Sequence, residues 1–277
     1  MPSATAINFA DVNPESSLPS RTNPRTERAE LSKKYCVPLP FIEVSLTVLI
    51  LHMKIYAHRG ASKDFPEHTL RAYNGAIAQG ADGFECDVRL SKDNVALLWH
   101  DSDLKRCAGV SGRIADLKYA QIRREYPEVL TLEELLALAK DNKKELAIET
   151  KHPVPSGNEI EKIVLDLLSQ EKNLPTISIM SFSWLAIEQT KRMAPHQNTV
   201  ALLHPSHSRL MRRFSSAKNL GPSIQMLRED STYMSESRDL FVWTVDKDED
   251  MQFCERNKVK VLITNTPSRA REVLGYH

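Results

Sequence analysis

The sequence has little cysteine, and none of it is arranged for zinc binding or dense cross-linking. Its 277 residues include four widely separated cysteines without a CxxC pair: Cys36, Cys86, Cys107 and Cys254. Zinc sites and disulfide frameworks in small domains depend on closely spaced cysteines, so the sequence disfavours both. The pattern is typical of a protein of the reducing cytoplasm.

The chain also lacks an excess of charge of either sign. It has 37 Lys and Arg against 36 Asp and Glu. Domains that bind nucleic acid usually carry a strongly basic surface, so nucleic acid is not an expected partner, and any anion must be bound by a local group of residues. A hydrophobic content of 41% with 26% charged residues is that of a globular protein with a packed core.

No segment predicts a stable membrane span or a secretion signal. The apolar stretch of residues 41–51 is shorter than the ~20 residues that a transmembrane helix needs, and it contains Glu43. It also begins too far into the chain to be the apolar region of a signal peptide. The sequence says nothing of the oligomeric state.

Residues 1 to about 40 are rich in Ser, Pro, Asn, Arg and Glu and lack apolar periodicity, as in the run from Asn13 to Pro24. We therefore interpret residues 1–52 as a disordered extension, or as one that is not part of the natural product, in which case Met53 is the natural start. The alternative is that the apolar stretch forms a short helix or strand on the outside of the domain.

From Ile55 onward, short apolar segments alternate with longer segments of helical pattern, which is typical of parallel strands joined by crossover helices. The helix expected over Thr131–Lys140 has Thr131 as its cap and an apolar face of leucines. Residues 53–277 are predicted to form one α/β barrel, for which the length is sufficient. The candidate strands are Ile55–His58, Gly83–Val88, Ala96–His100, Leu146–Thr150, Ile177–Ser181, Thr199–Leu203, Ser223–Met226, Leu240–Val245 and Val261–Thr264. They exceed the eight barrel positions by one, and the sequence does not identify the extra strand.

The polar side chains that could do chemistry follow these apolar segments. Barrel enzymes carry their active sites at the carboxyl ends of the strands, so these residues are expected to meet at one face. They are His58, Glu85 with Asp87, His100 with Asp101, and Glu149 with Lys151.

Two acidic residues at alternate positions of one strand indicate a metal site. Glu85 and Asp87 share a face, while Cys86 points to the opposite, helix-packed layer. Converging carboxylates repel unless a cation joins them, and oxygen ligands favour Mg²⁺ or Ca²⁺. The same period places Glu149 and Lys151 on one face of another strand, and Glu149 is the expected third ligand. Taken singly, each acid could instead cap a helix or pair with a surface cation.

Two histidines at strand ends, His58 and His100, could supply one general base and one general acid. Arg59 could bind a phosphate through two hydrogen bonds, and Lys151 could add charge. Asp101 could fix the tautomer of a neighbouring histidine, or could serve only as a helix cap or in a turn.

Trp243 could pack in the core or form a platform at the barrel mouth, and we favour the platform. Five other histidines lie in predicted loops or at the terminus, without polar partners nearby in the sequence. These are expected to be solvated: His152, His196, His204, His207 and His277.

These residues carry a resemblance to the glycerophosphodiester phosphodiesterases. His58-Arg59-Gly60 followed by Pro66-Glu67-His68-Thr69 resembles the HRG…PENT signature of that family, Gly83 to Val88 its ExD strand, and Trp99-His100-Asp101 its second histidine. Later segments resemble its remaining motifs in the same order: Ile148 to Lys151 the ExK strand, Ser181 to Ser183 the SFD turn, Trp243 to Asp246 the WTVN strand, and Leu262 to Pro267 the closing ITDxP. Motifs matched in order are far more specific than any one of them.

The resemblance implies a TIM-type (β/α)8 barrel that hydrolyses glycerophosphodiesters, which are small molecules, to glycerol 3-phosphate and an alcohol. His58 and His100 would be the acid–base pair, and Arg59 and Lys151 would contact the phosphate. Trp243 would contact the substrate. Glu85, Asp87 and Glu149 would bind one divalent cation, Mg²⁺ or Ca²⁺, and Glu67 would orient Arg59 or the metal site.

Three positions depart from the family pattern: His68 replaces the usual Asn, Asp246 the usual Asn, and Asn265 the usual Asp. They put loop geometry and substrate preference in question rather than the chemistry. The segment from His100 to Thr131 is short, so the inserted subdomain of longer relatives is expected to be absent.

Several questions stay open at the level of sequence. The residues do not say which histidine is the acid, or whether water or a glycerol hydroxyl attacks the phosphorus. Related barrels with the same residue types act as lysophospholipase D or sphingomyelinase D, and a silent barrel could bind phosphodiesters without cleaving them.

Overall fold

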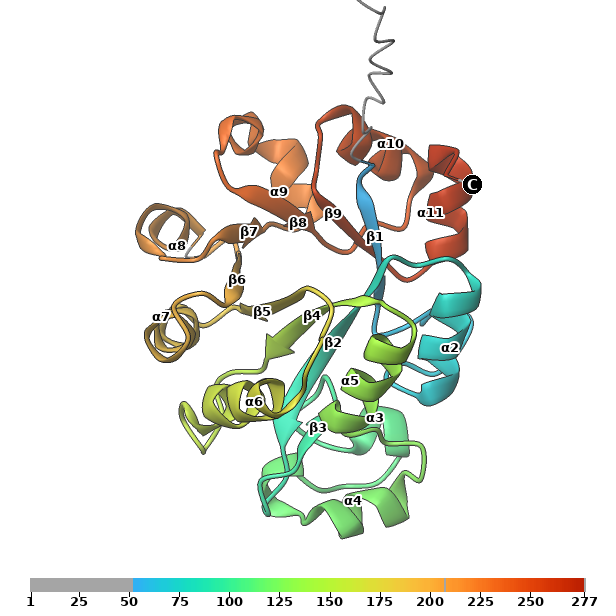
Figure 1. Ribbon diagram of the computed structural model, residues 1–277, viewed down its shortest axis with the longest axis vertical. Helices are drawn as coiled ribbons and strands as arrows, with labels where there is room; N and C mark the ends of the chain where they lie inside the picture. The colour runs from blue at the N-terminus through green and yellow to red at the C-terminus, as the bar shows by residue number, and fades with distance from the viewer. Residues whose placement is uncertain (1–51, 207, 277) are drawn as a thin grey trace, which may run out of the picture. The chain divides into compact units, whose positions relative to one another are not determined.

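The computed structural model describes residues 52–206 and 208–276, which contain a closed parallel barrel (Figure 1). Eight strands within these ranges follow one another around it, and the first pairs with both the second and the last, which closes the barrel. The prediction of an α/β barrel is therefore confirmed. The strands are β1 (Lys54–His58), β2 (Gly83–Leu90), β4 (Glu145–Thr150), β5 (Ile177–Ser181), β6 (Asn198–Leu202), β7 (Asn219–Gly221), β8 (Asp239–Val242) and β9 (Val261–Thr264).

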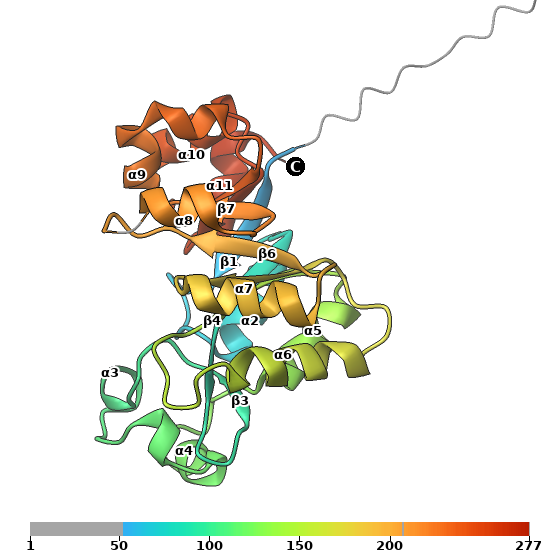
Figure 2. The ribbon, with the colours of Figure 1, turned by 90° about the vertical axis from the view of Figure 1, so that its left-hand side faces the viewer.

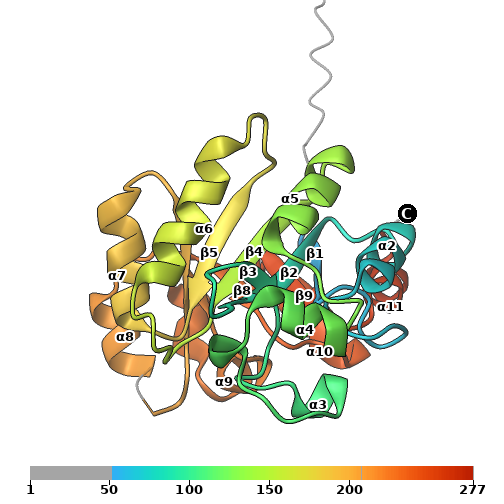
Figure 3. The ribbon, with the colours of Figure 1, turned by 90° about the horizontal axis from the view of Figure 1, so that it is seen from below.

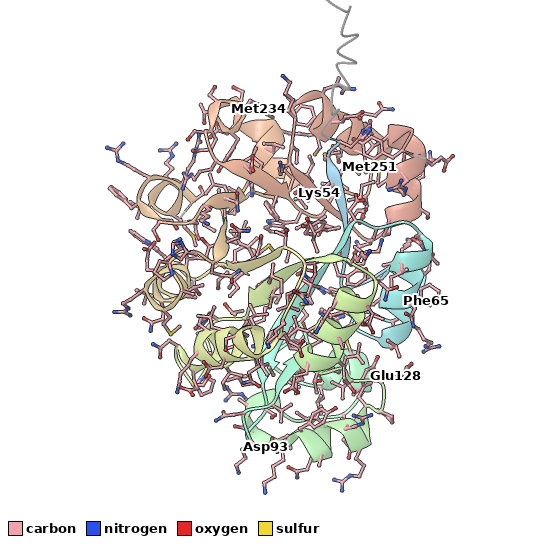
Figure 4. All side chains as sticks on the ribbon, viewed as in Figure 1. Lys54, Phe65, Asp93, Glu128, Met234 and Met251 are labelled. Carbon is pink, nitrogen blue, oxygen red and sulfur yellow. The ribbon has the colours of Figure 1, made fainter. Side chains whose placement is uncertain are left out.

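The extra strand of the sequence prediction is β3 (Ala96–Leu98), which pairs antiparallel with the end of β2. β2 continues past the barrel to Leu90, and the chain then reverses and runs back along it. Asp93 lies in the hairpin turn, at the lower end of the molecule in Figure 4, and accepts a 2.8 Å hydrogen bond from the backbone of Tyr119. The return along β2 brings the residues after β3, His100 among them, back to the barrel mouth.

The strand predicted over Ser223–Met226 is wrong. The seventh strand is β7, which precedes it, and the segment itself is the start of helix α9 (Ile224–Glu229). Pro222 lacks the N–H that would continue the ladder, and the Ser223 side chain accepts a hydrogen bond from the backbone N–H of Met226, which caps the helix. The local capping chemistry outweighs the apolar alternation.

The helices lie around the strands, as Figures 1 and 3 show. Helix α5 confirms the prediction for residues 131–140, because Thr131 caps it and Leu132, Leu135 and Leu136 are buried against the sheet. The other helices are α2 (Leu70–Ala78), α3 (Lys105–Ala108), α4 (Tyr119–Glu125), α6 (Glu159–Gln170), α7 (Trp184–Met193), α8 (Ser208–Phe214), α10 (Asp248–Arg256) and α11 (Pro267–Leu274), with α5 spanning Leu132–Asp141. No helix within the described ranges is both long and apolar enough to cross a bilayer.

The segment between β3 and α5 forms a small unit that packs around an apolar cluster shared with β3. It contains α3, α4 and a turn of 3-10 helix (Ile114–Asp116), which lie together below the barrel in Figures 1 and 2. No large inserted subdomain is present here, as expected, but the connection is more ordered than a plain loop. It is held by a separate apolar cluster of Leu97, Trp99, Leu104, Ile114, Ile122 and Val129.

The interpretations of residues 1–51, of Cys36 and of His207 and His277 concern positions outside the described residues.

Candidate active site

The strand register places the predicted polar residues side by side. His58 at the end of β1 is the register partner of Glu85 in β2, and Asp87 in β2 is the partner of Glu149 in β4. Partners in a parallel sheet project to the same face, so all four side chains point into the barrel mouth. Cys86, between the two acids, is buried in the layer that packs against the helices, as expected.

The turn after β1 brings a cation to these acids. Arg59 has a left-handed backbone (φ 59°) and Gly60 follows at φ 83°, where an added Cβ would lie 2.6 Å from the backbone of Ala72. This conformation costs energy for a residue other than glycine, and such cost is often retained at functional sites. It brings the Arg59 Nε to 2.9 Å from Asp87 Oδ2.

Three buried carboxylates form a cluster that can hold a metal ion. Glu85, Asp87 and Glu149 each offer an oxygen, and these oxygens lie within 4.8 Å of one another. Exposed fractions of 3%, 1% and 7% show that water does little to screen them. All-oxygen donors without thiolate or imidazole suit a hard divalent cation, so the residues present fit the ion that the sequence predicted.

The three acids of the cluster differ in the direction of their pKa shifts. Burial, with the neighbouring charge of Asp87, raises the pKa of Glu149 to about 7 and raises that of Glu85 well above its ordinary value. Burial would also raise the pKa of Asp87, but the hydrogen bond from His68 and the charge of Lys151 outweigh it and hold this pKa well below the usual range. The hydrogen bond and the nearby cations thus outweigh burial at Asp87, whereas burial and the charge of Asp87 outweigh the same cations at Glu85 and Glu149.

Lys151 bridges two of the acids. Its Nζ lies 2.8 Å from Glu149 Oε1 and 3.1 Å from Asp87 Oδ1. Together with Arg59, it lines one side of the cavity above the carboxylates, where a bound anion would meet both cations.

His58 contacts a residue from near the end of the chain, which follows the neighbouring strand β9. Its Nδ1 lies 2.7 Å from Asn265 Oδ1, and its Nε2 faces Glu85 Oε2 at 3.9 Å. Burial and the charge of Arg59 lower the pKa of His58 to about 4, so the ring is neutral at neutral pH.

His100 is held by a charged network instead. Its Nδ1 lies 2.7 Å from Asp101 Oδ1, and the other oxygen of Asp101 accepts a 2.6 Å hydrogen bond from Arg106 in α3. Arg106 in turn binds both oxygens of Glu67 at 2.7 and 2.8 Å, and Glu67 contacts Arg59 at 3.3 Å. Burial lowers the pKa of His100 from its ordinary value. The small unit between β3 and α5 is thereby tied to the barrel mouth.

The two histidines open onto one cavity of about 190 Å³. Trp243 also lines this cavity. Its indole N–H donates a 2.8 Å hydrogen bond to the backbone carbonyl of Gly221, and its ring meets that of Phe182 edge to face, with 5.4 Å between the ring centres. The ring is therefore held in place and also faces the cavity. The remaining lining residues include Arg59, Glu85, Glu149, Lys151, Met180, Leu202, Thr244 and Ile263.

Sequence reasoning missed two contacts of this centre. His68 is buried, has a left-handed backbone (φ 60°), and places Nε2 3.0 Å from Asp87 Oδ2 and Nδ1 3.0 Å from the Tyr73 hydroxyl. Arg106 was not singled out because its partners are distant in sequence. For His68, the departure from the family pattern was the available signal.

One expectation about the other histidines is wrong. His152 is not solvated, because its Nε2 lies 2.7 Å from Oε1 of the buried Glu161. His196 and His204 are exposed, and His204 contacts the hydroxyl of Ser206 at 2.9 Å. Sequence neighbours alone did not reveal the partner of His152, which lies in α6.

A parallel (β/α)8 barrel with this concentration of ionisable groups at the carboxyl ends of its strands is a barrel enzyme. The chain belongs to the glycerophosphoryl diester phosphodiesterase family, whose model matches residues 58–269, and it is a phosphodiesterase of that family.

Curated relatives match along most of their length. The chain is 34% identical over 256 residues to a probable glycerophosphodiester phosphodiesterase 1 of Mycobacterium tuberculosis, covering 81% of this chain and 93% of the relative. It is 30% identical over 230 residues to a glycerophosphodiester phosphodiesterase of Caldanaerobacter subterraneus, covering 77% and 94%.

Solved structures show the same fold. A glycerophosphodiester phosphodiesterase of Thermotoga maritima superposes with a TM-score of 0.69 at 24% identity, covering 80% of this chain and 98% of the other. A phosphodiesterase of Oleispira antarctica, in complex with the product sn-glycerol-3-phosphate, gives a TM-score of 0.72 at 21% identity, covering 80% and 96%.

Proposed function

We propose that this protein hydrolyses glycerophosphodiesters to glycerol 3-phosphate and an alcohol, with one bound Mg²⁺ or Ca²⁺ and with His58 and His100 as the acid–base pair. The observation that carries the proposal is that both histidines, two of the three clustered carboxylates and two cations line one cavity. The names of the relatives, and the product named with the Oleispira antarctica structure, support this substrate class.

The charge balance of the centre suits a phosphodiester. Three carboxylates oppose the two positive charges of Arg59 and Lys151, which leaves one net negative charge when all three acids are ionised. A divalent cation bound by Glu85, Asp87 and Glu149 would reverse this sign, so that the centre attracts the anionic substrate. When bound, the ion would act as a Lewis acid on a phosphoryl oxygen.

The protein's own side chains would do the remaining work. Arg59 and Lys151 would hold the phosphodiester oxygens, because both face the cavity and both remain protonated beside the acids. One histidine would take the proton of the attacking hydroxyl, and the other would protonate the leaving alkoxide. Trp243 would pack against the substrate, and Glu67 would orient Arg59 through their contact.

We further propose that residues 53–277 form the complete catalytic domain and that the protein works in the cytoplasm. The buried thiols of Cys86 and Cys254 are free, which suits a reducing compartment.

The test is the release of glycerol 3-phosphate from glycerophosphocholine and glycerophosphoethanolamine. We expect release from the wild type, none in chelator, and recovery with Mg²⁺ or Ca²⁺ but not with Zn²⁺. The His58→Ala/His100→Ala variant should be inactive, and His196→Ala, at an exposed histidine, should match the wild type.

Other outcomes would replace the proposal. Head-group release from lysophosphatidylcholine or sphingomyelin without activity on the glycerophosphodiesters would identify a phospholipase D-like enzyme. Substrate binding without turnover in any of the metals would identify a silent binding barrel.

A further inference from the structure

His58 begins a chain of two hydrogen bonds that runs through Asn265 and ends at the carboxylate of Asp246. Asn265, which follows β9, contacts His58 through Oδ1 at 2.7 Å and donates from Nδ2 to Asp246 Oδ2 at 2.6 Å. The backbone N–H of Asn265 and the hydroxyl of Thr264 both donate to Asp246 Oδ1, at 2.8 and 2.9 Å. The two oxygens of Asp246 thus fix both the backbone and the side chain of Asn265.

The chemistry of Asp246 determines which way the amide faces. An ionised carboxylate only accepts hydrogen bonds, so the amide nitrogen of Asn265 must point to it and the amide oxygen must point to His58. The hydroxyl of Ser62 lies 2.7 Å from that same oxygen and 2.8 Å from the carbonyl oxygen of His58, so its single proton is shared between two acceptors and the contact with Asp246 decides the orientation of the amide. Because the oxygen cannot donate, the proton between the two side chains belongs to His58 Nδ1.

The opposite nitrogen of the ring is then free of its proton. In a neutral imidazole with Nδ1 protonated, Nε2 carries a lone pair. The His58 side chain lines the reaction cavity, and its Nε2 lies 3.9 Å from Glu85 Oε2, which is beyond hydrogen-bond distance.

We propose that Asn265 and Asp246 are positioning residues that hold His58 in the Nδ1-protonated tautomer and aim its unprotonated Nε2 into the cavity. This deepens the proposed function and rests on it. It also accounts for two departures from the family pattern together, because an amide and a carboxylate have exchanged places along one line of hydrogen bonds. His100 differs, since its Nδ1 contacts the carboxylate of Asp101 directly.

Exchanging the two residues tests the proposal. Asn265→Asp sets two carboxylates against each other, and Asp246→Asn releases the amide of Asn265 to turn its nitrogen toward His58. The double variant Asp246→Asn/Asn265→Asp again pairs an amide with a carboxylate and leaves an acceptor beside Nδ1. Asp248→Asn is the matched control, because Asp248 lies on α10 nearby but pairs with Arg269.

Turnover of glycerophosphocholine is the first readout. Residues that orient a catalytic group typically contribute about 10–100-fold, so each single variant should lose that much, mainly in kcat with KM little changed. The double variant should recover to within about fivefold of the wild type, and the control should not change. The proposal is overturned if the single variants keep full kcat, or if the double variant is no better than either.

The second readout does not depend on activity. In protein with ¹⁵N-labelled histidine, the His58 resonances should show Nδ1 protonated in the wild type, the double variant and the control, and mixed tautomers in Asp246→Asn. A wild type with Nε2 protonated overturns the proposal. If the wild type proves inactive on glycerophosphodiesters, the proposed function fails, and this spectrum still decides the tautomer.

Melting temperatures identify any variant that fails to fold. Should Asn265→Asp be such a case, Asp246→Ala removes the carboxylate at an exposed position and carries the same two readouts, with the same expected loss of kcat.

Discussion

The two halves of the barrel interior differ in character although they belong to one closed sheet. The side contributed by β1, β2 and β4, with the residues after β3, carries the ionisable groups of the centre. The side contributed by β5, β6, β8 and β9 is mostly apolar, with Met180, Val200, Leu202, Phe241 and Ile263 among its inward-facing residues.

The difference shows how the fold separates two tasks. Charged groups that must meet a phosphate and a cation are gathered on neighbouring strands, where the register sets their spacing. The opposite wall contributes mainly shape and packing. The indole N–H of Trp243 on that side is engaged by the backbone of Gly221, Thr244 also lines the cavity, and Asn265 after β9 contacts His58. Substitutions in the first half, or of the Asn265–Asp246 pair that holds His58, should therefore affect kcat, and substitutions of the apolar residues in the second half should affect stability or KM.

The largest effect is expected in the charged half. His58→Ala and His100→Ala should each lower kcat by about 10²–10⁴-fold, the usual contribution of a general acid or base, with little change in melting temperature. A nitrophenyl phosphodiester needs little protonation of its leaving group. It should therefore rescue the variant that lacks the acid and leave the other impaired.

Steady-state kinetics on both substrates, with circular dichroism to check folding, would measure this. Near-normal rates for both variants on glycerophosphodiesters would contradict the two-histidine mechanism and remove the functional distinction between the halves.

The apolar half should show the opposite response. Phe241 is 6% exposed and meets Tyr56 edge to face inside the barrel, 6.2 Å between ring centres. Phe241→Ala should lower the free energy of unfolding by about 3–5 kcal/mol, as expected for removal of a buried aromatic ring. Chemical denaturation would measure the loss, and kcat of the folded fraction should stay within a few-fold. A large loss of kcat without loss of stability would show that this wall takes part in the chemistry.

A smaller effect concerns pH and the cation. The pKa of Glu149 is about 7 in the metal-free protein, because burial and the charge of Asp87 raise it. Above this pH the group is ionised and ready to bind; below it, the cation must displace a proton. The affinity for Mg²⁺ or Ca²⁺ should thus fall by at least about tenfold per pH unit as the pH drops below 7, because the raised pKa of Glu85 adds a second proton to displace. Calorimetric titrations at several pH values would show this, and an affinity independent of pH would remove Glu149 from the ligand set.

The smallest effect should follow removal of the residues before Met53. Both halves of the barrel lie after Met53, because the first strand begins at Lys54. A chain that begins at Met53 should therefore keep its activity and its melting temperature. A loss of several degrees or aggregation of the shortened chain would show that the preceding residues belong to the fold.

Much of the fold could be predicted from the sequence, because most of the barrel strands are short, mainly apolar segments with buried side chains. Eight of the nine candidate strands correspond to observed ones, with bounds that differ by up to three residues. The exception is Ser223–Met226, where a Ser cap after Pro222 decides for helix. The role of β3 as the extra strand depends on pairing partners, which local pattern does not specify.

The centre could be anticipated in part for a similar reason. Glu85 with Asp87, and Glu149 with Lys151, follow from the two-residue period and from the rule that strand ends meet at one face. The contacts of His68 with Asp87 and of Arg106 with Glu67 could not, because they join residues whose proximity only the folded chain creates. The partner of His152 was missed for the same reason.

The contact between His58 and Asn265 has a consequence for the order of events during synthesis. The two residues are 207 positions apart, and they adjoin the strands β1 and β9 that close the barrel. At about 5–20 residues per second, roughly 10–40 s separate their addition to the growing chain. During that interval β1 has no partner on its β9 side, and His58 has no amide to orient it. A ribosome-bound chain should therefore acquire catalytic competence only after its last strand has emerged.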